Sequence, residues 1–561
     1  MSERRFPDAA SRERANFRAI EKFPRELRHS AWHGGQLLAF SALDGVTDYQ
    51  DGLTARTAFD APGLEVLLPA RCRIRFPKAA ADGNVVTGDC FYLETEPAVT
   101  GVFLDAHHLL IEGPCAVSDV EMALAVAANG TRTLIGSARH YDPAKIAADL
   151  PSVLEDRGLW LRSLRFPSLP TSLAKRTLTK ACSIMKTQVY SPEGRIRHRW
   201  TTPDRWPHRQ MWLWDSAFHA IGWRHIAPRL AQDAILAVFD MQATNGFVPH
   251  MMNPNGASQI TQPPVLALGA KLVHDVTGDD AWLKALYPCL RAYLAWDLKN
   301  RDLDGCGLCE WQMDADPHCR SGESGMDNSP RFDSATRMAA VDFNSYLSLE
   351  CEILAKFARD LGFADDAAQW RDQHLEINRR IATRLWSEDL GFFVDYDTER
   401  QTPSPVLASS GFLPLICGAA SRAHAARLAE CLSDPTMFGT ALSVPSIAAR
   451  DKGRYAKDMW RGPVWINLNW LIARGFERYG FIKLAEQLRS RTMEAIEDAF
   501  AKHGTLFEFY DDRQEIAPPR LLRKGQCAPE ASPYHQVFHD YGWTATLYVD
   551  FAFTHKSSGE S

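Results

Sequence analysis

The pattern that most constrains the fold lies beyond Leu173, where amphipathic segments of helical period follow one another, separated by loops containing Gly, Pro and Asp. About a dozen helices of ordinary length, with their loops, fill the roughly 380 residues that remain. A toroid of six helical hairpins is the economical packing for that number. A helical solenoid is the alternative, but it needs a repeat of fixed period, and the sequence shows none. The clearest segments are Ala231–Met241, Asp280–Tyr287, Tyr346–Leu361, Asp366–Trp386, Ala419–Leu432 and Phe481–Phe500.

The region before these helices favours strands. Between residues 35 and 140, short apolar stretches are separated by Gly, Pro and Asp, with no helical pattern between them, which predicts a β-sandwich. The charged stretch up to about Leu27 and the polar stretch from Asp142 to Leu169 are predicted to be helical, with a linker at Phe166–Pro170. We therefore expect a mainly α chain, with an N-terminal β-sandwich domain over 1–140, a helical linker over 141–170 and an (α/α)6 barrel domain over 171–555. The clearest strands are Gln36–Phe40, Leu64–Leu68, Gly101–Leu104 and Met122–Ala127.

Composition limits the partners and the compartment. A charged content of 24%, a net charge of −6 and the lack of a long basic run argue against nucleic-acid binding. No segment has the roughly 18 consecutive apolar residues of a membrane span, and the N-terminus lacks the apolar stretch of a signal peptide. The twelve Cys are scattered, as is typical of reduced thiols. We expect a cytoplasmic protein with a small partner, no nucleic acid and no membrane contact; the sequence leaves the oligomeric state open.

One cluster contains residue types that bind zinc. Cys306 and Cys309 form a C-x-x-C pair that His318 and Cys319 follow. The loop between the two pairs is short, however, and the second pair lacks the spacing of metal ligands. We expect a bland Cys-containing loop and no metal.

The segment Glu323–Arg331 places two carboxylates, small turn-forming residues and a guanidinium in nine positions. Met326 is its only large apolar side chain, so a helix or strand here would have no face to bury, and a turn is favoured. A carboxylate on a rigid loop is a natural acid or base. The alternative is that Asp327 or Asn328 only caps a helix that begins near Pro330.

Four more segments mix Trp with charged or amide residues, or set an amide beside a rigid turn, so that each can line a pocket. In one of them Trp460 and Trp465 flank Arg461 and a Gly-Pro turn, which offers a flat apolar wall together with hydrogen-bond donors, as a ring-shaped polar ligand requires. The alternative is a Trp-rich core with buried Arg–Asp pairs. The segments are Gln210–His219, Ile260–Val265, Met459–Trp470 and Tyr541–Thr544.

A fifth segment, Thr505–Arg513, places Glu508 between aromatic residues. Aromatic neighbours desolvate a carboxylate and raise its pKa, whereas a nearby Arg or a water-filled pocket keeps it ionised, and the sequence leaves both open. Only a closed fold brings Glu508 close to Asp327, which lies far away in the chain. The alternative for Glu508 is a solvated surface carboxylate.

Together and in the same order, these motifs resemble glycoside hydrolase family 63 and its relatives. The relatives include the processing α-glucosidases, the mannosylglycerate and glucosylglycerate hydrolases and, as cousins, the family 37 trehalases. The resemblance runs from about Trp206 to Trp543 and implies an (α/α)6 barrel, behind a β-sandwich in many members, with no cofactor. The motifs that carry it are Trp214–His219, Thr261–Pro264, Glu323–Arg331, Trp460–Asn467 and Glu508–Asp511.

The resemblance implies an inverting, exo-acting α-glycosidase that acts on a small saccharide, an α-glucoside or an α-mannoside. Asp327 is then the general acid, kept protonated, and Glu508 the general base, kept charged, so their surroundings should push the two pKa values apart. Rival acids are Asp314, Asp316 and Glu323, and rival bases are Glu515 and Glu530. The residues that the resemblance implies for sugar binding are Trp212, Trp214, Asp215, Phe218, His219, Gln262, Asn328, Trp460, Arg461, Trp465, Asn467 and Trp543.

Two other classes of function stay open. Barrels of paired helices also house sugar epimerases and isomerases, for which the histidines would move protons; a catalytically inactive sugar-binding relative is the second possibility. The chain also departs from the family, because residues 512–540 stand where the family commonly has a Gly-rich turn, so the leaving group is left open. The candidate histidines of an isomerase are His219, His250, His535 and His539.

Overall fold

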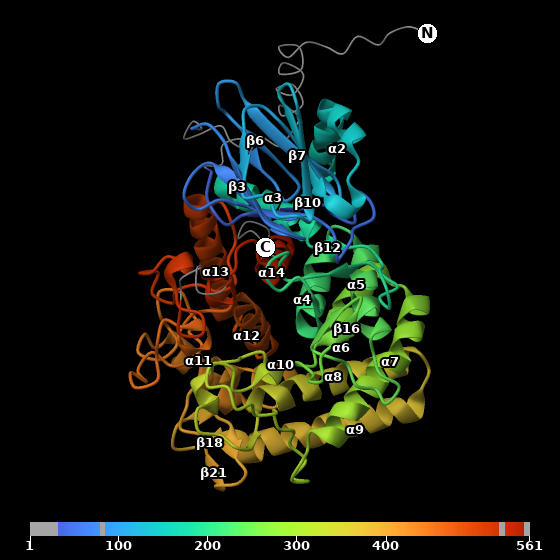
Figure 1. Cartoon of the computed structure of the whole chain (residues 1–561). Helices are drawn as coiled ribbons and strands as arrows, with labels where there is room; N and C mark the ends of the chain where they lie inside the picture. Colours follow the sequence, from blue (N-terminus) through green and yellow to red (C-terminus); the bar gives the residue numbers. More distant parts are fainter. Residues whose placement is uncertain (1–31, 79–84, 527–532, 555–561) are drawn as a thin grey trace.

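The computed structural model describes residues 32–78, 85–526 and 533–554 (Figure 1). The chain first forms two antiparallel sheets, one with the strand order β1-β2-β3-β4-β9 and the other with the order β10-β11-β8-β7-β6-β5. The helix predicted up to Leu27 lies outside the described residues. The strands are β1 (Leu37–Ala39), β2 (Thr54–Thr57), β3 (Gly63–Leu68), β4 (Cys72–Arg75), β5 (Val85–Val86), β6 (Cys90–Leu93), β7 (Val99–Asp105), β8 (His108–Glu112), β9 (Ala116–Ser118), β10 (Leu124–Asn129) and β11 (Arg132–Ser137).

Side chains of both sheets share an apolar core that contains Leu38, Ile74 and Phe103. Strand β4 shows how the alternation works, because Cys72 and Ile74 are buried while Arg73 between them is exposed. The six-stranded sheet is covered on its other face as well, by the helix α2 (Leu150–Ser163). Both faces of β8 are therefore buried, and its whole sequence is apolar apart from its two ends.

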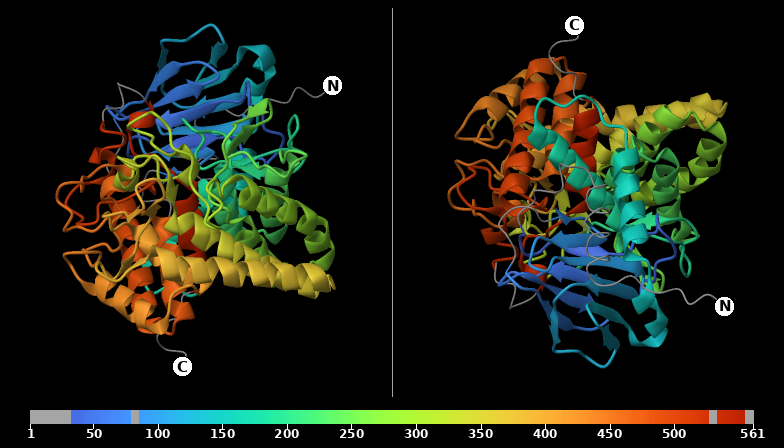
Figure 2. Two further views of the ribbon diagram at one scale, coloured as in Figure 1. Left: turned by 90° about the horizontal axis from the view of Figure 1, so that it is seen from below. Right: turned by 90° about the horizontal axis from the view of Figure 1, so that it is seen from above.

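The helices beyond the sheets form a closed ring. Each of six inner helices packs against the next, and the last packs back against the first. The sheets lie at one end of the molecule and the helical ring at the other (Figure 1, Figure 2). The inner helices are α4 (Leu213–Trp223), α6 (Leu266–Thr277), α8 (Val341–Asp360), α10 (Pro414–Cys417), α12 (Ile466–Arg478) and α14 (Gly542–Thr554). The outer helices are α3 (Ser172–Thr187), α5 (Pro228–Asp240), α7 (Asp280–Asn300), α9 (Ala364–Arg380), α11 (Arg422–Ser433) and α13 (Ile482–His503).

Burial separates the inner from the outer helices. Nearly every side chain of α14 is buried, as expected for a helix surrounded by protein. In α9 only Trp370, His374 and Ile377 are buried, at the helical spacing of one face. The predicted helical toroid with a β part before it agrees with this arrangement.

All the helices and strands predicted as clear cases are present, with shifted ends. The segment predicted over Asp366–Trp386 begins two residues earlier, and its last turn, Ile381–Leu385, is a π-helix. The segment predicted from Ala419 begins only at Arg422, because the Ser421 hydroxyl accepts a hydrogen bond from the His424 amide and fixes the start of the helix.

Short strand pairs complete the loops of the helical ring. One of them, β14 with β15, leads directly into α4. The short strands are β12 (Val189–Tyr190), β13 (Trp200–Thr201), β14 (Met211–Trp212), β15 (Met251–Asn253), β16 (Gly256–Ala257), β17 (Met338–Ala339), β18 (Trp386–Ser387), β19 (Phe392–Phe393), β20 (Tyr396–Asp397) and β21 (Thr402–Pro403).

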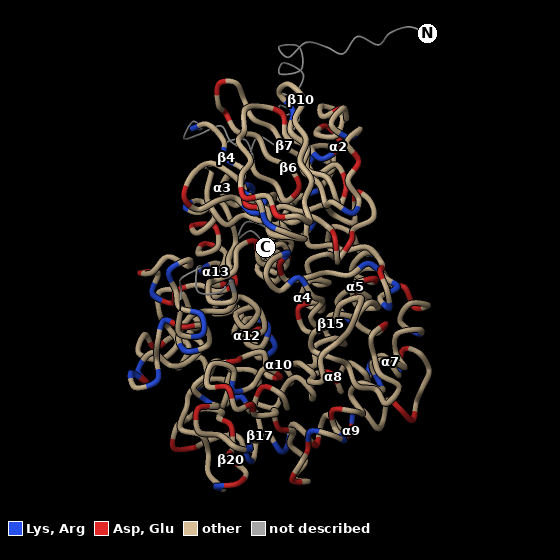
Figure 3. Tube along the Cα trace, in the orientation of Figure 1, with Lys and Arg blue, Asp and Glu red and all other residues tan. Residues whose placement is uncertain are grey.

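None of the described helices combines the length and the apolar character that crossing a membrane requires. Basic and acidic residues are interspersed along the trace (Figure 3). Of Cys306, Cys309, His318 and Cys319, only Cys306 belongs to a group of three potential metal ligands that lie close together in the described part of the chain, and its partners in that group are Asp302 and Asp304.

Candidate active site

A cavity of about 200 Å³ lies at the N-terminal ends of several inner helices. Trp214 and Asp215 come from the first turn of α4, Trp465 is the N-cap of α12, and Trp543 is in the first turn of α14. Asp327 and Glu508, far apart in the chain, both line this one cavity. Its other lining residues are Pro203, His208, Trp212, His250, Gln262, Cys319, Gly322, Gly325, Met459, Arg523, Lys524 and Tyr541.

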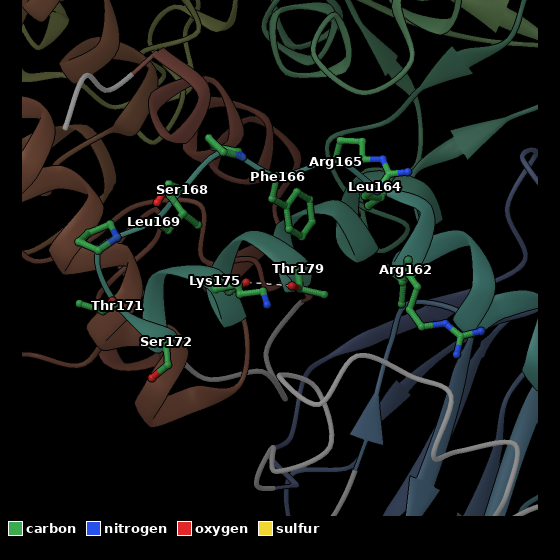
Figure 4. Close-up of a pocket in the computed structure, with 13 residues that line it drawn as sticks. Arg162, Leu164, Arg165, Phe166, Ser168, Leu169, Thr171, Ser172, Lys175 and Thr179 are labelled. Atoms are coloured by element: carbon green, nitrogen blue, oxygen red, sulfur yellow. Dashed lines mark hydrogen bonds between the residues drawn. The ribbon is translucent and has the colours of Figure 1, made fainter. Parts of the chain in front are cut away.

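A larger hollow follows the segment between α2 and α3 and has a volume of about 750 Å³ (Figure 4). Arg162, Arg165 and Lys175 contribute to its wall, but no Asp or Glu does. Acid–base chemistry on a sugar requires carboxyl groups, so size does not identify the active site here, and the smaller cavity is the candidate.

Asp327 sits in a loop between two single turns of 3-10 helix, Gly322–Ser324 and Pro330–Phe332. Its backbone carbonyl accepts hydrogen bonds from the amides of Arg320 and Ser321, at 2.9 and 3.4 Å. Gly325 has a φ of +68°, and a Cβ there would stand 2.5 Å from the Trp214 ring. Glycine therefore allows the loop to lie against the tryptophan wall of the cavity.

The capping alternative for this loop is wrong in its detail. The turn does begin at Pro330, as expected, but its N-cap is Ser329. The Asn328 side chain instead accepts a hydrogen bond from the Trp460 amide at 3.0 Å. Asn328 thus ties the loop that carries Asp327 to the Trp460–Trp465 segment.

Arg331 anchors the Asp327 loop to two buried carboxylates. Its guanidinium makes paired hydrogen bonds with the carboxylates of Asp342 and Asp395, at 2.6 to 2.9 Å, and all three side chains are buried. Burial raises the pKa of Asp395, and the positive charge of Arg331 opposes that rise.

We expect Arg331→Met to lower the free energy of unfolding by about 3 to 5 kcal/mol, because two buried carboxylates lose their counter-charge. Urea denaturation followed by tryptophan fluorescence measures the loss. Arg400→Met is the matched control, since Arg400 pairs with Asp397 at a mostly exposed position. Equal stabilities of the two variants would contradict the anchoring role.

Glu508 lies after α13 in an extended segment. Its amide donates to the Phe538 carbonyl at 3.1 Å, and its carbonyl accepts from the Trp543 indole at 3.4 Å. The carboxylate accepts from Arg523 at 3.0 and 3.3 Å. The solvated alternative for Glu508 is wrong, because only 3% of its side chain is exposed.

Two consecutive cations pair with the two carboxylates. Arg523 pairs with Glu508, and the Lys524 ammonium lies 3.0 Å from the Asp327 carboxylate. Asp327 and Lys524 keep 19% and 23% of their side chains exposed, whereas Arg523 keeps 4%. The Asp327 pair therefore stands nearer the solvent, and the Glu508 pair lies deeper.

The two pKa values are pushed apart, in the opposite direction to the sequence expectation. Burial favours a higher pKa for Asp327, but the charges of Lys524 and Arg523 outweigh it and lower the pKa. Burial raises the pKa of Glu508, and Arg523 only partly opposes the rise. Of the two carboxyl groups, Glu508 is therefore the one that holds a proton more readily.

The cavity also presents buried polar atoms that have no partner among the described residues. They include the Asp215 Oδ1 and the Trp212 Nε1. Burial, together with the charges of Asp204 and Glu508, raises the pKa of Asp215 well above its usual range. Such atoms cost free energy in an empty cavity, and hydroxyl groups of a sugar can satisfy them.

Comparison with known proteins places these features in a family. Residues 208–544 match the family described as the mannosylglycerate hydrolase MGH1-like glycoside hydrolase domain. The chain belongs to this family. It is a glycoside hydrolase, and the family region contains both carboxylates and all of the tryptophan walls.

Curated relatives include hydrolases of glycerate glycosides. A mannosylglycerate hydrolase of Thermus thermophilus is 29% identical over 388 residues, which cover 54% of this chain and 89% of the relative. A glucosylglycerate hydrolase of Mycolicibacterium hassiacum is 24% identical over 409 residues, covering 55% and 87%. The solved structure of the family 63 mannosylglycerate hydrolase of Thermus thermophilus in complex with glucose superposes with a TM-score of 0.55 at 25% identity, covering 67% of this chain and 99% of that one.

Of the residues that the family resemblance implied for sugar binding, half line the cavity of this glycoside hydrolase and half lie behind it. Phe218 packs against Trp470 and Trp543. The Trp460 ring stacks on the Trp465 ring, with 3.8 Å between the ring centroids. The Arg461 guanidinium pairs with Asp333 instead of facing the cavity. Those that line it are Trp212, Trp214, Asp215, Gln262, Trp465 and Trp543, and those behind it are Phe218, His219, Asn328, Trp460, Arg461 and Asn467.

The rival carboxylates among the described residues do not line the cavity. Glu323 is buried, pairs with Arg301 and accepts from the amides of Thr261 and Gln312, so it holds loops together. Asp314 and Asp316 accept from backbone amides of their own loop, and Glu515 is exposed. Glu530 lies outside the described residues.

The histidines proposed for an isomerase do not converge. Only His250 of the four lines the cavity, where burial lowers its pKa to about 4. His219 is buried against the Thr201 hydroxyl, and His539 packs between Phe59 and Phe507. His535 contacts Gln526 instead of the cavity.

Several cavity residues of the enzyme were not predicted from the sequence. Arg523 and Lys524 lie in the 512–540 segment, where an Arg-Lys-Gly turn without apolar period was the available signal. His208 lies just before the first motif and hydrogen-bonds Asp204. Met459, at a φ of +46°, accepts a hydrogen bond from the Trp465 indole through its carbonyl.

Proposed function

We propose that this glycoside hydrolase is an inverting, exo-acting α-glycosidase that cleaves a small α-glucoside or α-mannoside, with Asp327 as general acid and Glu508 as general base. The observation that carries the proposal is the convergence of the two carboxylates in one tryptophan-walled cavity. A sugar-binding relative without catalysis has no need for such a pair. An isomerase needs converging histidines, and of the four candidate histidines, all of them among the described residues, only His250 lines the cavity.

The size and depth of the cavity support exo action. About 200 Å³ accommodates roughly one sugar ring and excludes a long glucan. Glu508 and Asp215 lie at its buried end and Asp327 at its more exposed end. A terminal sugar bound at the depth then directs its glycosidic oxygen toward Asp327 and the solvent.

The chemistry follows from these positions. Protonated Asp327 gives its proton to the glycosidic oxygen as the bond to the anomeric carbon breaks. Glu508 takes a proton from a water that attacks the same carbon from the opposite face, and the released sugar has the inverted configuration. Room for that water requires a separation of roughly 6.5 to 9.5 Å between the two carboxyl groups.

Inversion is tested by following the reaction with proton NMR from its first turnovers. We expect the β-anomer of the released sugar to appear first and then to mutarotate. A screen of glucosylglycerate, mannosylglycerate, trehalose and short α-glucans identifies a substrate for the measurement. An initial α-anomer would contradict the two-carboxylate water mechanism, and conversion of free mannose or glucose would support the isomerase instead.

The remaining assignments are part of the proposal. We assign a β-sandwich domain to 1–140, a linker to 141–170 and the (α/α)6 catalytic barrel to 171–555, with the two packed sheets and the ring of helices in support. A cytoplasmic location, with a small saccharide as the partner, is supported by the eleven free thiols among the described residues.

A further inference from the structure

We propose that Lys524 is the binding site for an acidic leaving group, a glycosidically linked small hydroxy acid, and that this acidic group draws Lys524 away from Asp327 and so makes Asp327 available as the proton donor. The proposal rests on the function given above. It adds a residue that selects the substrate and a step that couples binding to protonation.

The backbone fixes Lys524 in place. Arg523 and Gln526 are joined by two backbone hydrogen bonds, and the two residues between them, Lys524 and Gly525, have φ values of +56° and +80°. Positive φ at both central residues is the requirement of a tight type I′ turn. A Lys rarely adopts such a backbone, which indicates that its side-chain position is the feature being maintained.

The turn is fastened to a neighbouring segment on both sides. The Leu522 amide donates to the Lys457 carbonyl at 2.9 Å, and the Met459 amide donates to the Leu522 carbonyl at 3.1 Å. Within the turn itself, the Gly525 amide donates to the Asp458 carboxylate at 3.0 Å. Because the base of the turn is held, its tip presents Lys524 to the cavity.

Of the two cations in the cavity, Lys524 is the one that can change its carboxylate partner. The cavity is lined by two basic side chains of Lys or Arg type, Arg523 and Lys524. Arg523 is committed to Glu508 through two hydrogen bonds and to the Tyr534 carbonyl through a third. Lys524 is more exposed and its flexible chain contacts Asp327, so a second carboxylate can compete for it.

The position of Lys524 matches that of a leaving group. A general acid stands beside the glycosidic oxygen, so a group 3.0 Å from Asp327 lies next to the leaving group and not next to the sugar. Asp215 and Glu508, both buried, line the inner end of the cavity. An acidic substituent on the leaving group therefore meets the ammonium of Lys524.

Binding of this substituent changes the protonation of the acid. The charged or titratable side chains that face Asp327 are Lys524, Arg523, Cys319 and His250, and the two cations lower its pKa. An incoming carboxylate pairs with Lys524 and also adds a negative charge beside Asp327. Both effects raise the pKa of Asp327, so Asp327 takes up the proton that it donates in the reaction.

The test compares two glycosides of one sugar whose leaving groups are D-glycerate and its neutral amide, glyceramide. In the wild type we expect a higher kcat/KM for the glycerate glycoside. Lys524→Met should lower that preference about tenfold or more, since a charged hydrogen bond is lost only for the acid. Lys452→Met, at an exposed loop position, is the matched control and should leave both values unchanged.

The pH profile separates this role from a merely structural one. With Lys524→Met the pKa of Asp327 rises, so kcat/KM for the neutral glycoside should increase on the alkaline side of the profile and stay the same on the acidic side. The increase is about tenfold for each unit by which the pKa rises. Equal losses for both glycosides, or an unchanged alkaline side, would overturn the proposal.

A binding measurement keeps the inference apart from the proposed function. Calorimetry with D-glycerate and with glyceramide requires no turnover. We expect D-glycerate to bind the wild type more tightly than Lys524→Met, and glyceramide to show no such difference. D-glycerate binding that is the same in both proteins overturns the role of Lys524, whereas failure of the wild type to cleave any glycoside overturns the proposed function alone.

Discussion

Asp327→Asn should lower the turnover of an ordinary glycoside by about 10²- to 10⁴-fold, because the departing oxygen then leaves without a proton. The same variant should hydrolyse a glycosyl fluoride at a rate close to that of the wild type, since fluoride needs no protonation to leave. Initial rates on both substrates, measured with equal amounts of folded protein, give the comparison. A general acid predicts this contrast, and a residue that only holds the loop does not.

Asp316→Asn is the control for this experiment. Asp316 lies eleven residues before Asp327, is exposed, and was a rival candidate for the acid. It should behave as the wild type on both substrates. An Asp327→Asn variant that turns over a natural disaccharide normally would refute the assignment of the acid.

The family resemblance implies that Asp327, the acid, is kept protonated and that Glu508, the base, is kept charged. In the structure the neighbouring cations lower the pKa of Asp327 and burial raises that of Glu508, which is the reverse order. The reactive form, with the proton on Asp327, is then the minor one of two singly protonated forms. A substrate that raises the pKa of Asp327 above that of Glu508 can therefore raise the rate.

The fold was predictable because periodicity reports burial directly. Segments such as Phe481–Phe500 carry one apolar face, and the structure places that face on the inner ring. The strands between 35 and 140 were also predictable from their turn residues. The ends were less so, since a cap such as the one Ser421 provides depends on a single hydrogen bond.

The sequence predicted which segments contribute to the site, but not which residues of each segment line the cavity. On α4, Trp214 and Asp215 in the first turn line the cavity, whereas Phe218 one turn later points into the core. On α12, Trp465 at the cap lines it and Asn467 does not. The inner helices run away from the cavity, so only their first residues reach it, and a sequence motif does not show where that boundary falls.

The paired cations could not be predicted from local sequence. Arg523 and Lys524 reach the cavity because backbone hydrogen bonds dock their turn on residues 457–459. Such docking depends on contacts between segments far apart in the chain. What the sequence did show was that residues 512–540 depart from the family pattern, and Arg523 and Lys524 both lie within them.

Glu508→Gln should abolish inverting hydrolysis more completely than the acid variant does. A neutral amide cannot accept the proton of the attacking water, so turnover of both the ordinary glycoside and the glycosyl fluoride should fall by about 10²- to 10⁴-fold. The amide oxygen still accepts a hydrogen bond from Arg523, so the fold should persist, as circular dichroism can check. The two carboxylate variants thus differ in one measurable respect, their response to a good leaving group.

Glu515→Gln provides the control for the base, since Glu515 is exposed, lies seven residues further on and was a rival candidate. It should retain full activity. Rescue of Glu508→Gln by the glycosyl fluoride would refute the role of Glu508 as base, because the leaving group does not affect activation of the water. Loss on both substrates, set against loss on one for Asp327→Asn, would assign the two carboxyl groups to opposite sides of the sugar, as inversion requires.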